Sequence, residues 1–148
     1  FNRSHYEDVL VVRVDSLAPK PVWQRRYEQI NAFERQLAHA DIRVVKIFLH
    51  ISKDEQKRRF DQRLEDPRKH WKFDPADLRK RAQWDEYVRA FEDVFRHCST
   101  AEAPWHVVPA NRKWLRDLAV ARILLDAFEA MPLKWPRPKY DPKKIRVE

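Results

Sequence analysis

Hydrophobic residues recur at intervals of three and four positions along most of this chain, the spacing that places them on one face of an α-helix. The clearest case runs from residue 23 to residue 40, where charged side chains fill many of the positions between. Its apolar positions are Trp23, Tyr27, Ile30, Phe33, Leu37 and Ala40. This pattern predicts a long amphipathic helix that ends before Asp41.

The next segment changes to a run rich in β-branched residues. Residues 42–51 form a short, mostly apolar run, which predicts a strand. Ser52 follows, with Glu55 three positions later, and this is the pattern of a capping box at the start of a helix. We expect that helix to end near Leu64. A strand that leads directly into a capped helix is typical of α/β proteins.

The second half of the chain repeats this order of elements. Residues 66–73 are polar and basic and are predicted to form a loop. Asp74, which is followed by proline, is expected to begin a helix that continues to about Cys98. Residues 104–109 have the pattern of a short buried strand, after which Asn111 is expected to cap a final helix. The apolar side of that helix carries Trp114, Leu115, Leu118, Ala121, Leu125 and Phe128.

The remaining segments lie near the ends of the chain. Residues 6–14 have two acidic residues near their start, which favours the first turn of a helix, so we expect a helix there rather than a strand. Residues 16–22 contain two prolines and are predicted to form a loop. Residues 132–148 are rich in proline and lysine and are expected to form an extended tail after a domain at residues 1–131.

Together these elements predict an α/β protein, mostly helical, with two short strands. Two strands are too few for a free-standing α/β sheet, so we expect part of the domain to precede Phe1. The 148 residues also include no glycine. The chain therefore holds no glycine-rich phosphate loop of the GxxxxGK[ST] or GxGxxG type. If the protein uses such a loop, we expect it in the preceding part.

Charge indicates the class of partner. Lys and Arg number 31 against 23 Asp and Glu, a net charge of +8, and the isoelectric point is near 9.8. An anionic partner is therefore expected: a nucleic acid, a phosphorylated metabolite or a membrane surface. The single cysteine, Cys98, cannot form an internal disulfide, so we expect a cytoplasmic protein. No apolar stretch approaches the roughly 20 residues that a membrane helix needs, and no membrane partner is expected.

The first candidate site is the polar cluster at the start of the chain. Phe1 is followed by Asn2, Arg3, Ser4, His5, Tyr6, Glu7 and Asp8. If Phe1 ends a strand, this cluster lies beyond the carboxyl end of that strand, where open α/β sheets bind ligands. Its guanidinium, hydroxyl and carboxylate groups suit phosphate and Mg²⁺ chemistry. The alternative is a solvated loop that leads into a helix.

The second candidate site is the basic segment 57–72. Arg59 and Arg63 are four positions apart and so share one face of the predicted helix, and Lys69 and Lys72 follow in the predicted loop. Guanidinium forks and flexible ammonium groups can grip successive phosphates of an anionic chain. The alternative is an ordinary charged helix face, because acidic residues alternate with these cations.

At these same residues the sequence resembles the polyphosphate kinase 2 family, which moves phosphoryl groups between inorganic polyphosphate and nucleotides on a P-loop kinase fold similar to that of thymidylate kinase. The family's second phosphate motif is matched by residues 1–6 and by Arg13-Val14. The family's lid pattern is matched, in order, by Arg59-Phe60, Arg63, Asp66-Pro67, Trp71-Lys72-Phe73, Asp74-Pro75-Ala76-Asp77-Leu78, Trp84 and Tyr87. Agreement extends to about residue 130. One departure is Asn2, where many members carry Asp.

The resemblance implies a parallel-sheet fold of the P-loop kinase type and roles for individual residues. The expected catalytic residues are Asn2, Arg3 and Glu7. The expected phosphate- and polyphosphate-binding residues are Arg13, Arg59, Arg63, Lys69 and Lys72, the last four in a lid at about residues 52–98. The resemblance further implies Mg²⁺ as cofactor and, as substrates, polyphosphate with a nucleoside mono-, di- or triphosphate. We also expect a homo-oligomer.

Two other functions are compatible with the same residues. One is an ATP-dependent nucleoside monophosphate kinase, which would work without polyphosphate. The other is a basic helical module that binds nucleic acid, although such modules usually concentrate their charge on one face, whereas here acidic residues are interspersed on most helices. We therefore expect no nucleic-acid partner. The chain by itself is expected to be inactive, because it lacks a phosphate loop.

Overall fold

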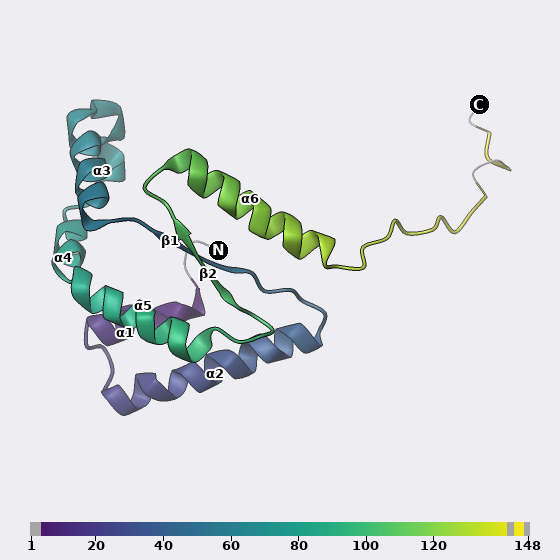
Figure 1. Ribbon diagram of the computed structural model, residues 1–148, viewed down its shortest axis with the longest axis horizontal. Helices are drawn as coiled ribbons and strands as arrows, with labels where there is room; N and C mark the ends of the chain where they lie inside the picture. Colours follow the sequence, from purple (N-terminus) through teal and green to yellow (C-terminus); the bar gives the residue numbers. More distant parts are fainter. Residues whose placement is uncertain (1–3, 142–143, 147–148) are drawn as a thin grey trace.

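The computed structural model describes residues 4–141 and 144–146. Two strands run through the middle of the molecule with helices around them, and residues 132–141 extend away as a tail (Figure 1). In chain order the elements are η1 (His5–Asp8), α1 (Val11–Val14), α2 (Lys20–His39), β1 (Lys46–His50), α3 (Lys53–Glu65), η2 (Pro67–Lys72), α4 (Ala76–Ala82), α5 (Trp84–Cys98), β2 (Trp105–Pro109) and α6 (Lys113–Glu129), where η marks a 3₁₀ helix.

The two strands form a parallel pair, which confirms the α/β prediction. Lys46 of β1 pairs with Trp105 of β2, and His50 pairs with Pro109 at the other end. Because a tight turn cannot join parallel strands, the connection between them carries α3, η2, α4 and α5. The predicted strand at residues 42–51 is too long, since β2 offers partners to only five of its residues.

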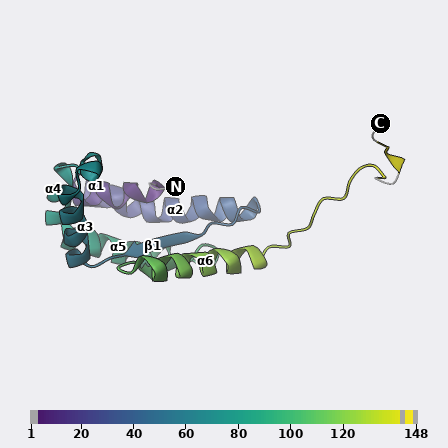
Figure 2. The same cartoon turned by 90° about the horizontal axis from the view of Figure 1, so that it is seen from above.

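The core lies between α2, α5 and the N-terminal segment. Helix α2 lies on one side of the strands and α6 on the other (Figure 2). The buried core residues are Tyr6, Val9, Leu10, Trp23, Tyr27, Ile30, Ala90, Val94 and Cys98. The predicted apolar face of α2 is thus confirmed at Trp23, Tyr27 and Ile30, whereas Phe33 is 45% exposed.

The start of α3 follows its sequence signal, but the start of α6 does not. The Ser52 hydroxyl accepts a hydrogen bond from the Glu55 N–H over 3.1 Å. The prediction that Asn111 caps α6 is wrong, because Arg112 occupies the N-cap and makes no capping bond with its side chain. Asn111 Oδ1 instead accepts a hydrogen bond from the Ser52 N–H over 2.9 Å. This bond joins the segments that follow β1 and β2.

The helix predicted from Asp74 to Cys98 is in fact two helices, α4 and α5, with a break at Gln83. The Gln83 N–H donates to the Lys80 carbonyl, a three-residue step that ends α4. Asp15, just after α1, accepts hydrogen bonds from the side chains of both Lys80 and Gln83. A contact from a distant part of the chain therefore accompanies the break.

Two boundaries near the N-terminus also differ from the prediction. Residues 6–14 form η1 and α1 rather than one helix, and the neighbouring side chains of Val9 and Leu10 are both buried in the core. Helix α2 begins inside the predicted loop at residues 16–22. Pro21 lies in its first turn, where the missing proline N–H leaves no hydrogen bond unmade.

Helix α6 carries many of the exposed apolar side chains. Trp114, Leu118 and Phe128 are all more than half exposed, and no side chain of α6 is buried. These residues nonetheless do not make α6 a membrane helix. Throughout the described part of the chain, every helix is too short or too polar to span a bilayer.

Candidate lid and motif site

The segment that begins at Ser4 carries the first candidate site. Ser4 caps η1, because its hydroxyl accepts a hydrogen bond from the Tyr6 N–H over 3.3 Å. Glu7 is half-buried in η1 and forms no ion pair with a cation of the described residues. Asn2 and Arg3 lie outside the described residues, so their roles stay predictions.

Next to η1 lies a buried ionic cluster that was not predicted from the sequence. Glu34 of α2 and Lys46 of β1 are 1% and 6% exposed, and their charged atoms are 2.6 Å apart. The Tyr6 hydroxyl donates to Glu34 Oε1 and accepts from Lys46 Nζ, both over 2.8 Å. Burial and the hydrogen bond to Glu34 raise the pKa of Tyr6 far above its usual value, so the hydroxyl keeps its proton. One sequence signal pointed to the cluster: Lys46 interrupts an apolar strand.

Arg13 lies in α1 and contacts two other helices. Its guanidinium is 2.7 Å from Asp93 Oδ2 of α5 and donates to the Tyr27 hydroxyl of α2 over 3.4 Å. The guanidinium carbon also lies 4.8 Å from the centre of the Trp23 ring. Any phosphate that Arg13 binds must therefore share this guanidinium with Asp93.

Arg59 lies on α3 beside the carboxyl end of β2. Its Nε donates to Glu55 Oε1 and its terminal nitrogen donates to the Ala110 carbonyl, each over 2.7 Å. Hydrogen bonds from Arg58 and Arg59 lower the pKa of Glu55 to about 2, so this carboxylate stays charged and holds the guanidinium. Arg59 is therefore fixed at the edge of the sheet where α/β proteins bind ligands.

Arg63 lies one turn further along α3 and faces η2. It donates to the Lys72 carbonyl over 3.4 Å, and its guanidinium carbon is 5.5 Å from the centre of the Phe60 ring. Phe60 in turn meets Phe73 edge to face at 5.7 Å between ring centres. These contacts fold residues 66–73 back onto α3, so most of the predicted loop is an ordered 3₁₀ turn.

The two lysines predicted to bind polyphosphate, Lys69 and Lys72, lie on η2. Lys69 Nζ is 2.9 Å from Asp66 Oδ2, and Lys72 Nζ is 4.9 Å from the centre of the Trp71 ring. Hydrogen bonds from Arg68 and Lys69 lower the pKa of Asp66 to about 2. The Trp71 side chain is 79% exposed. The surface of η2 is therefore cationic and open to a large ligand.

The structure thus brings the four predicted lid residues onto one unit, α3 with η2. We call this unit, residues 53–72, the lid base. Arg13 lies elsewhere, against α2 and α5, and no hydrogen bond or ion pair in the described part of the chain joins it to the lid base.

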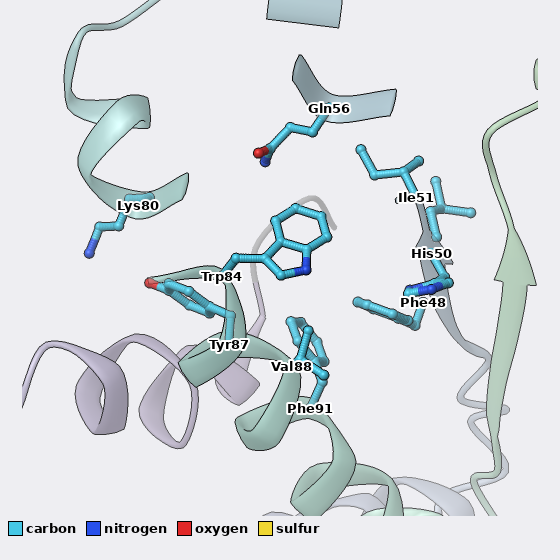
Figure 3. A pocket seen from close by; sticks show the side chains of 10 residues that line it. Phe48, His50, Ile51, Gln56, Lys80, Trp84, Tyr87, Val88 and Phe91 are labelled. Atoms are coloured by element: carbon cyan, nitrogen blue, oxygen red, sulfur yellow. The ribbon is translucent and has the colours of Figure 1, made fainter. Parts of the chain in front are cut away.

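An apolar pocket of about 240 Å³ lies between the carboxyl end of β1 and α5 (Figure 3). Trp84 and Tyr87 line it from α5 and Phe48 from β1. Among the described residues, Lys80 is the one lysine or arginine in its lining, and that ammonium group binds Asp15. The pocket therefore suits apolar packing better than phosphate binding.

The described residues contain no group of three or more His, Cys, Asp or Glu side chains arranged to hold a metal ion. Mg²⁺, however, often takes only one or two protein carboxylates and completes its shell with water and substrate phosphates. Asp8 is 3.4 Å from Arg26 and 63% exposed. Glu7 offers a carboxylate without such a partner in residues 4–141, so it fits as one protein ligand of Mg²⁺.

Comparison with known proteins gives a consistent result. The family model described as Polyphosphate kinase 2 matches residues 1–136. An AMP/ADP-polyphosphate phosphotransferase from Meiothermus ruber is 50% identical, and the match covers 100% of this chain and 55% of that protein. An ADP-polyphosphate phosphotransferase from Rhodopseudomonas palustris is 40% identical, and the match covers 92% of this chain and 51% of that protein. The chain thus spans about half the length of these relatives.

Solved structures agree with the sequence matches. The crystal structure of polyphosphate kinase 2 from Arthrobacter aurescens is 49% identical and superposes with a TM-score of 0.94. The superposition covers 97% of this chain and 50% of that one. The resemblance inferred from the motif residues is thereby confirmed, and the chain belongs to the polyphosphate kinase 2 family.

Proposed function

We propose that the full-length protein transfers a phosphoryl group between inorganic polyphosphate and a nucleoside mono- or diphosphate. The observation that carries the proposal is the lid base, which gathers Arg59, Arg63, Lys69 and Lys72 on one unit. Guanidinium groups one helical turn apart, next to exposed ammonium groups, suit an anion with about one charge per phosphate. The net charge of +8 adds long-range attraction for the same ligand.

The names of the relatives support this choice of substrates. The Meiothermus ruber protein is named for transfer between polyphosphate and AMP or ADP, and the Rhodopseudomonas palustris protein for transfer between polyphosphate and ADP. We extend this pair of substrate classes to the protein described here. The names do not favour an ATP-dependent monophosphate kinase.

The proposed reaction is an in-line displacement. An oxygen of the nucleotide phosphate attacks the terminal phosphorus of polyphosphate, the bond to the bridging oxygen breaks, and the polymer becomes one phosphate shorter. Such a transition state needs positioning and charge neutralisation more than covalent chemistry. We assign Arg59 and Arg63 to the transferring group and Lys69 and Lys72 to the polyphosphate chain. Closure of the lid would exclude water and so limit hydrolysis.

The remaining assignments rest on the family motif. Asn2 and Arg3 are assigned to the reaction centre and Arg13 to a second phosphate. Glu7, which directly follows the motif, is assigned to the reaction centre, where its carboxylate would be one ligand of Mg²⁺, an ion that neutralises phosphate charge. A cytoplasmic location, a homo-oligomeric state and the lack of a nucleic-acid partner stay predictions from the sequence.

A transfer assay with the full-length protein tests the proposal. Polyphosphate, Mg²⁺ and AMP or ADP are expected to yield the next higher nucleotide and a shorter polyphosphate, measured by ³¹P NMR. Phosphorylation of a nucleotide by ATP without polyphosphate would identify an ATP-dependent kinase instead. Tighter binding of single-stranded DNA than of polyphosphate at matched salt, in a filter-binding assay, would favour the nucleic-acid alternative.

A further inference from the structure

The buried cluster next to η1 is fully paired. The Lys46 ammonium group has three N–H donors and three acceptors: the Tyr6 hydroxyl at 2.8 Å, Glu34 Oε2 at 2.6 Å and the Cys98 carbonyl at 2.6 Å. Glu34 Oε1 accepts from the Tyr6 hydroxyl and lies 3.2 Å from His5 Nε2. The Tyr6 hydroxyl is thus both donor and acceptor, which fixes its orientation.

A buried ion pair is a poor source of stability. Removing two charges from water costs about as much as their attraction returns, and apolar residues of similar size often serve the fold as well. Glu34 and Lys46 are nonetheless almost completely buried. A role in placing other groups accounts for the pair better than a role in stability.

The cluster joins four separate elements. Tyr6 comes from η1, Glu34 from α2, Lys46 from β1 and Cys98 from the end of α5. The ring of Tyr6 also packs edge to face on Trp105 of β2, with 4.9 Å between ring centres. The hydroxyl end and the ring of Tyr6 are therefore both held, by different parts of the fold.

Tyr6 belongs to the segment that carries the predicted reaction centre. Its N–H binds the Ser4 hydroxyl, and its carbonyl accepts hydrogen bonds from the N–H groups of Val9 and Leu10. Glu7, assigned to the reaction centre, follows Tyr6 directly, and Arg3 directly precedes Ser4 in the sequence. A shift of Tyr6 would therefore move the backbone on both of its sides.

We propose that Glu34 and Lys46 are positioning residues for phosphoryl transfer: they hold the Tyr6 hydroxyl and through it the backbone from Ser4 to Glu7, where the family motif ends. This inference rests on the proposed function and adds residues far from that motif in sequence. The two charged side chains need not touch substrate. They set where residues 4–7 lie relative to the sheet.

The test is Tyr6→Phe in the full-length protein, which removes the hydroxyl and keeps the ring against Trp105. We expect kcat to fall at least about tenfold, because a misplacement of about 1 Å at a reacting centre can cost 100-fold. The KM values for polyphosphate and for AMP are expected to stay within about twofold. The thermal midpoint is expected to fall by several degrees, because the change leaves a buried donor of Lys46 and a buried acceptor of Glu34 unpaired. A purely structural role would lower the midpoint and leave kcat unchanged.

Two further measurements separate the outcomes. Hydrogen exchange at residues 4–10 is expected to be at least about tenfold faster in Tyr6→Phe, since those amides report on η1 directly. Tyr140→Phe, an exposed tyrosine in the tail, is the matched control and should match the wild type in every readout. The double variant Glu34→Gln/Lys46→Met leaves no unpaired buried charge. Its kcat is expected to fall about as far as that of Tyr6→Phe.

The results distinguish this inference from the proposed function. An active wild type together with an unchanged kcat in Tyr6→Phe would overturn the inference alone. A wild type that transfers nothing from polyphosphate would overturn the proposed function, and this inference with it. Exchange at η1 that is no faster than in the wild type would also contradict the positioning role.

Discussion

Arg59 on α3 donates a hydrogen bond to the carbonyl oxygen of Ala110, 51 positions later and directly after β2, over 2.7 Å. Glu55 holds the same guanidinium from within α3. Arg59 is therefore anchored at two points, one in the lid base and one at the sheet. Within the described residues, Arg63 makes a single hydrogen bond of 3.4 Å, to the Lys72 carbonyl. The two arginines share a helix face but differ in how firmly they are held.

Replacing either lid arginine by alanine is expected to lower kcat of the full-length protein by roughly 10²–10³-fold, because each removes a positioned cation from a highly charged transition state. Of the two changes, Arg59→Ala is expected to lower the thermal midpoint as well, since Arg59 bonds to the Ala110 carbonyl after β2 whereas Arg63 bonds within the lid base. Arg35→Ala, an exposed change on α2, is the control. Steady-state kinetics and thermal melts measure both effects. Equal turnover in all three variants would contradict the lid assignment.

The exposed lysines predict that polyphosphate binding weakens with salt. Screening reduces attraction between exposed charges beyond a distance of about 10 Å at 0.1 M salt. We expect KM for polyphosphate to rise between about 50 and 300 mM NaCl, and to rise less steeply in Lys69→Gln/Lys72→Gln. Lys20→Gln, an exposed change at the start of α2, should keep the wild-type slope. If KM for polyphosphate rose with salt as steeply in the double variant as in the wild type, the assignment of both lysines to polyphosphate binding would be contradicted.

The acidic side chains of the lid base predict a loss of stability in acid. The pKa of Glu55 falls from 4.5 to about 2, chiefly through Arg58, and that of Asp66 from 3.8 to about 2, chiefly through Arg68. Because both pKa values are lower in the folded chain, their contribution is complete above about pH 4.5 and is lost as the pH falls toward 2.

Urea unfolding at pH 6 and pH 3 measures this effect. The variant Glu55→Gln/Asp66→Asn is expected to lose less stability between the two pH values than the wild type, because it has fewer protons to take up. Glu28→Gln, an exposed change on α2, should behave as the wild type does. If the free energy of unfolding changed equally between pH 6 and pH 3 in all three proteins, these ion pairs would not contribute to folding stability.

The buried pair predicts a non-additive effect on stability. Lys46→Met alone leaves Glu34 as an uncompensated buried charge and is expected to cost about 3–5 kcal/mol. Adding Glu34→Gln removes that charge and should recover most of the loss. Urea denaturation of both variants measures the coupling. A single variant as stable as the double would mean that Glu34 reaches water or takes up a proton at little cost.

Local order in this protein could be predicted from neighbouring residues, because it depends on contacts within a few positions. The helical spacing in α2 and the Ser52 cap of α3 are of this kind. So is the placing of Arg59 and Arg63 one turn apart on α3. The family also follows from the order of short motifs, which needs no knowledge of how they meet in space.

Tertiary contacts decided the rest. Asn111 binds Ser52 across 59 positions instead of capping its own helix, and Gln83 breaks a predicted helix while bound to Asp15, 68 positions away. The Tyr6 bond to Glu34 spans 28 positions. A polar side chain is satisfied by whichever partner the packed helices and strands bring to it, and a local pattern does not specify that partner. The cost of burying a charge likewise depends on groups that only the folded chain brings together.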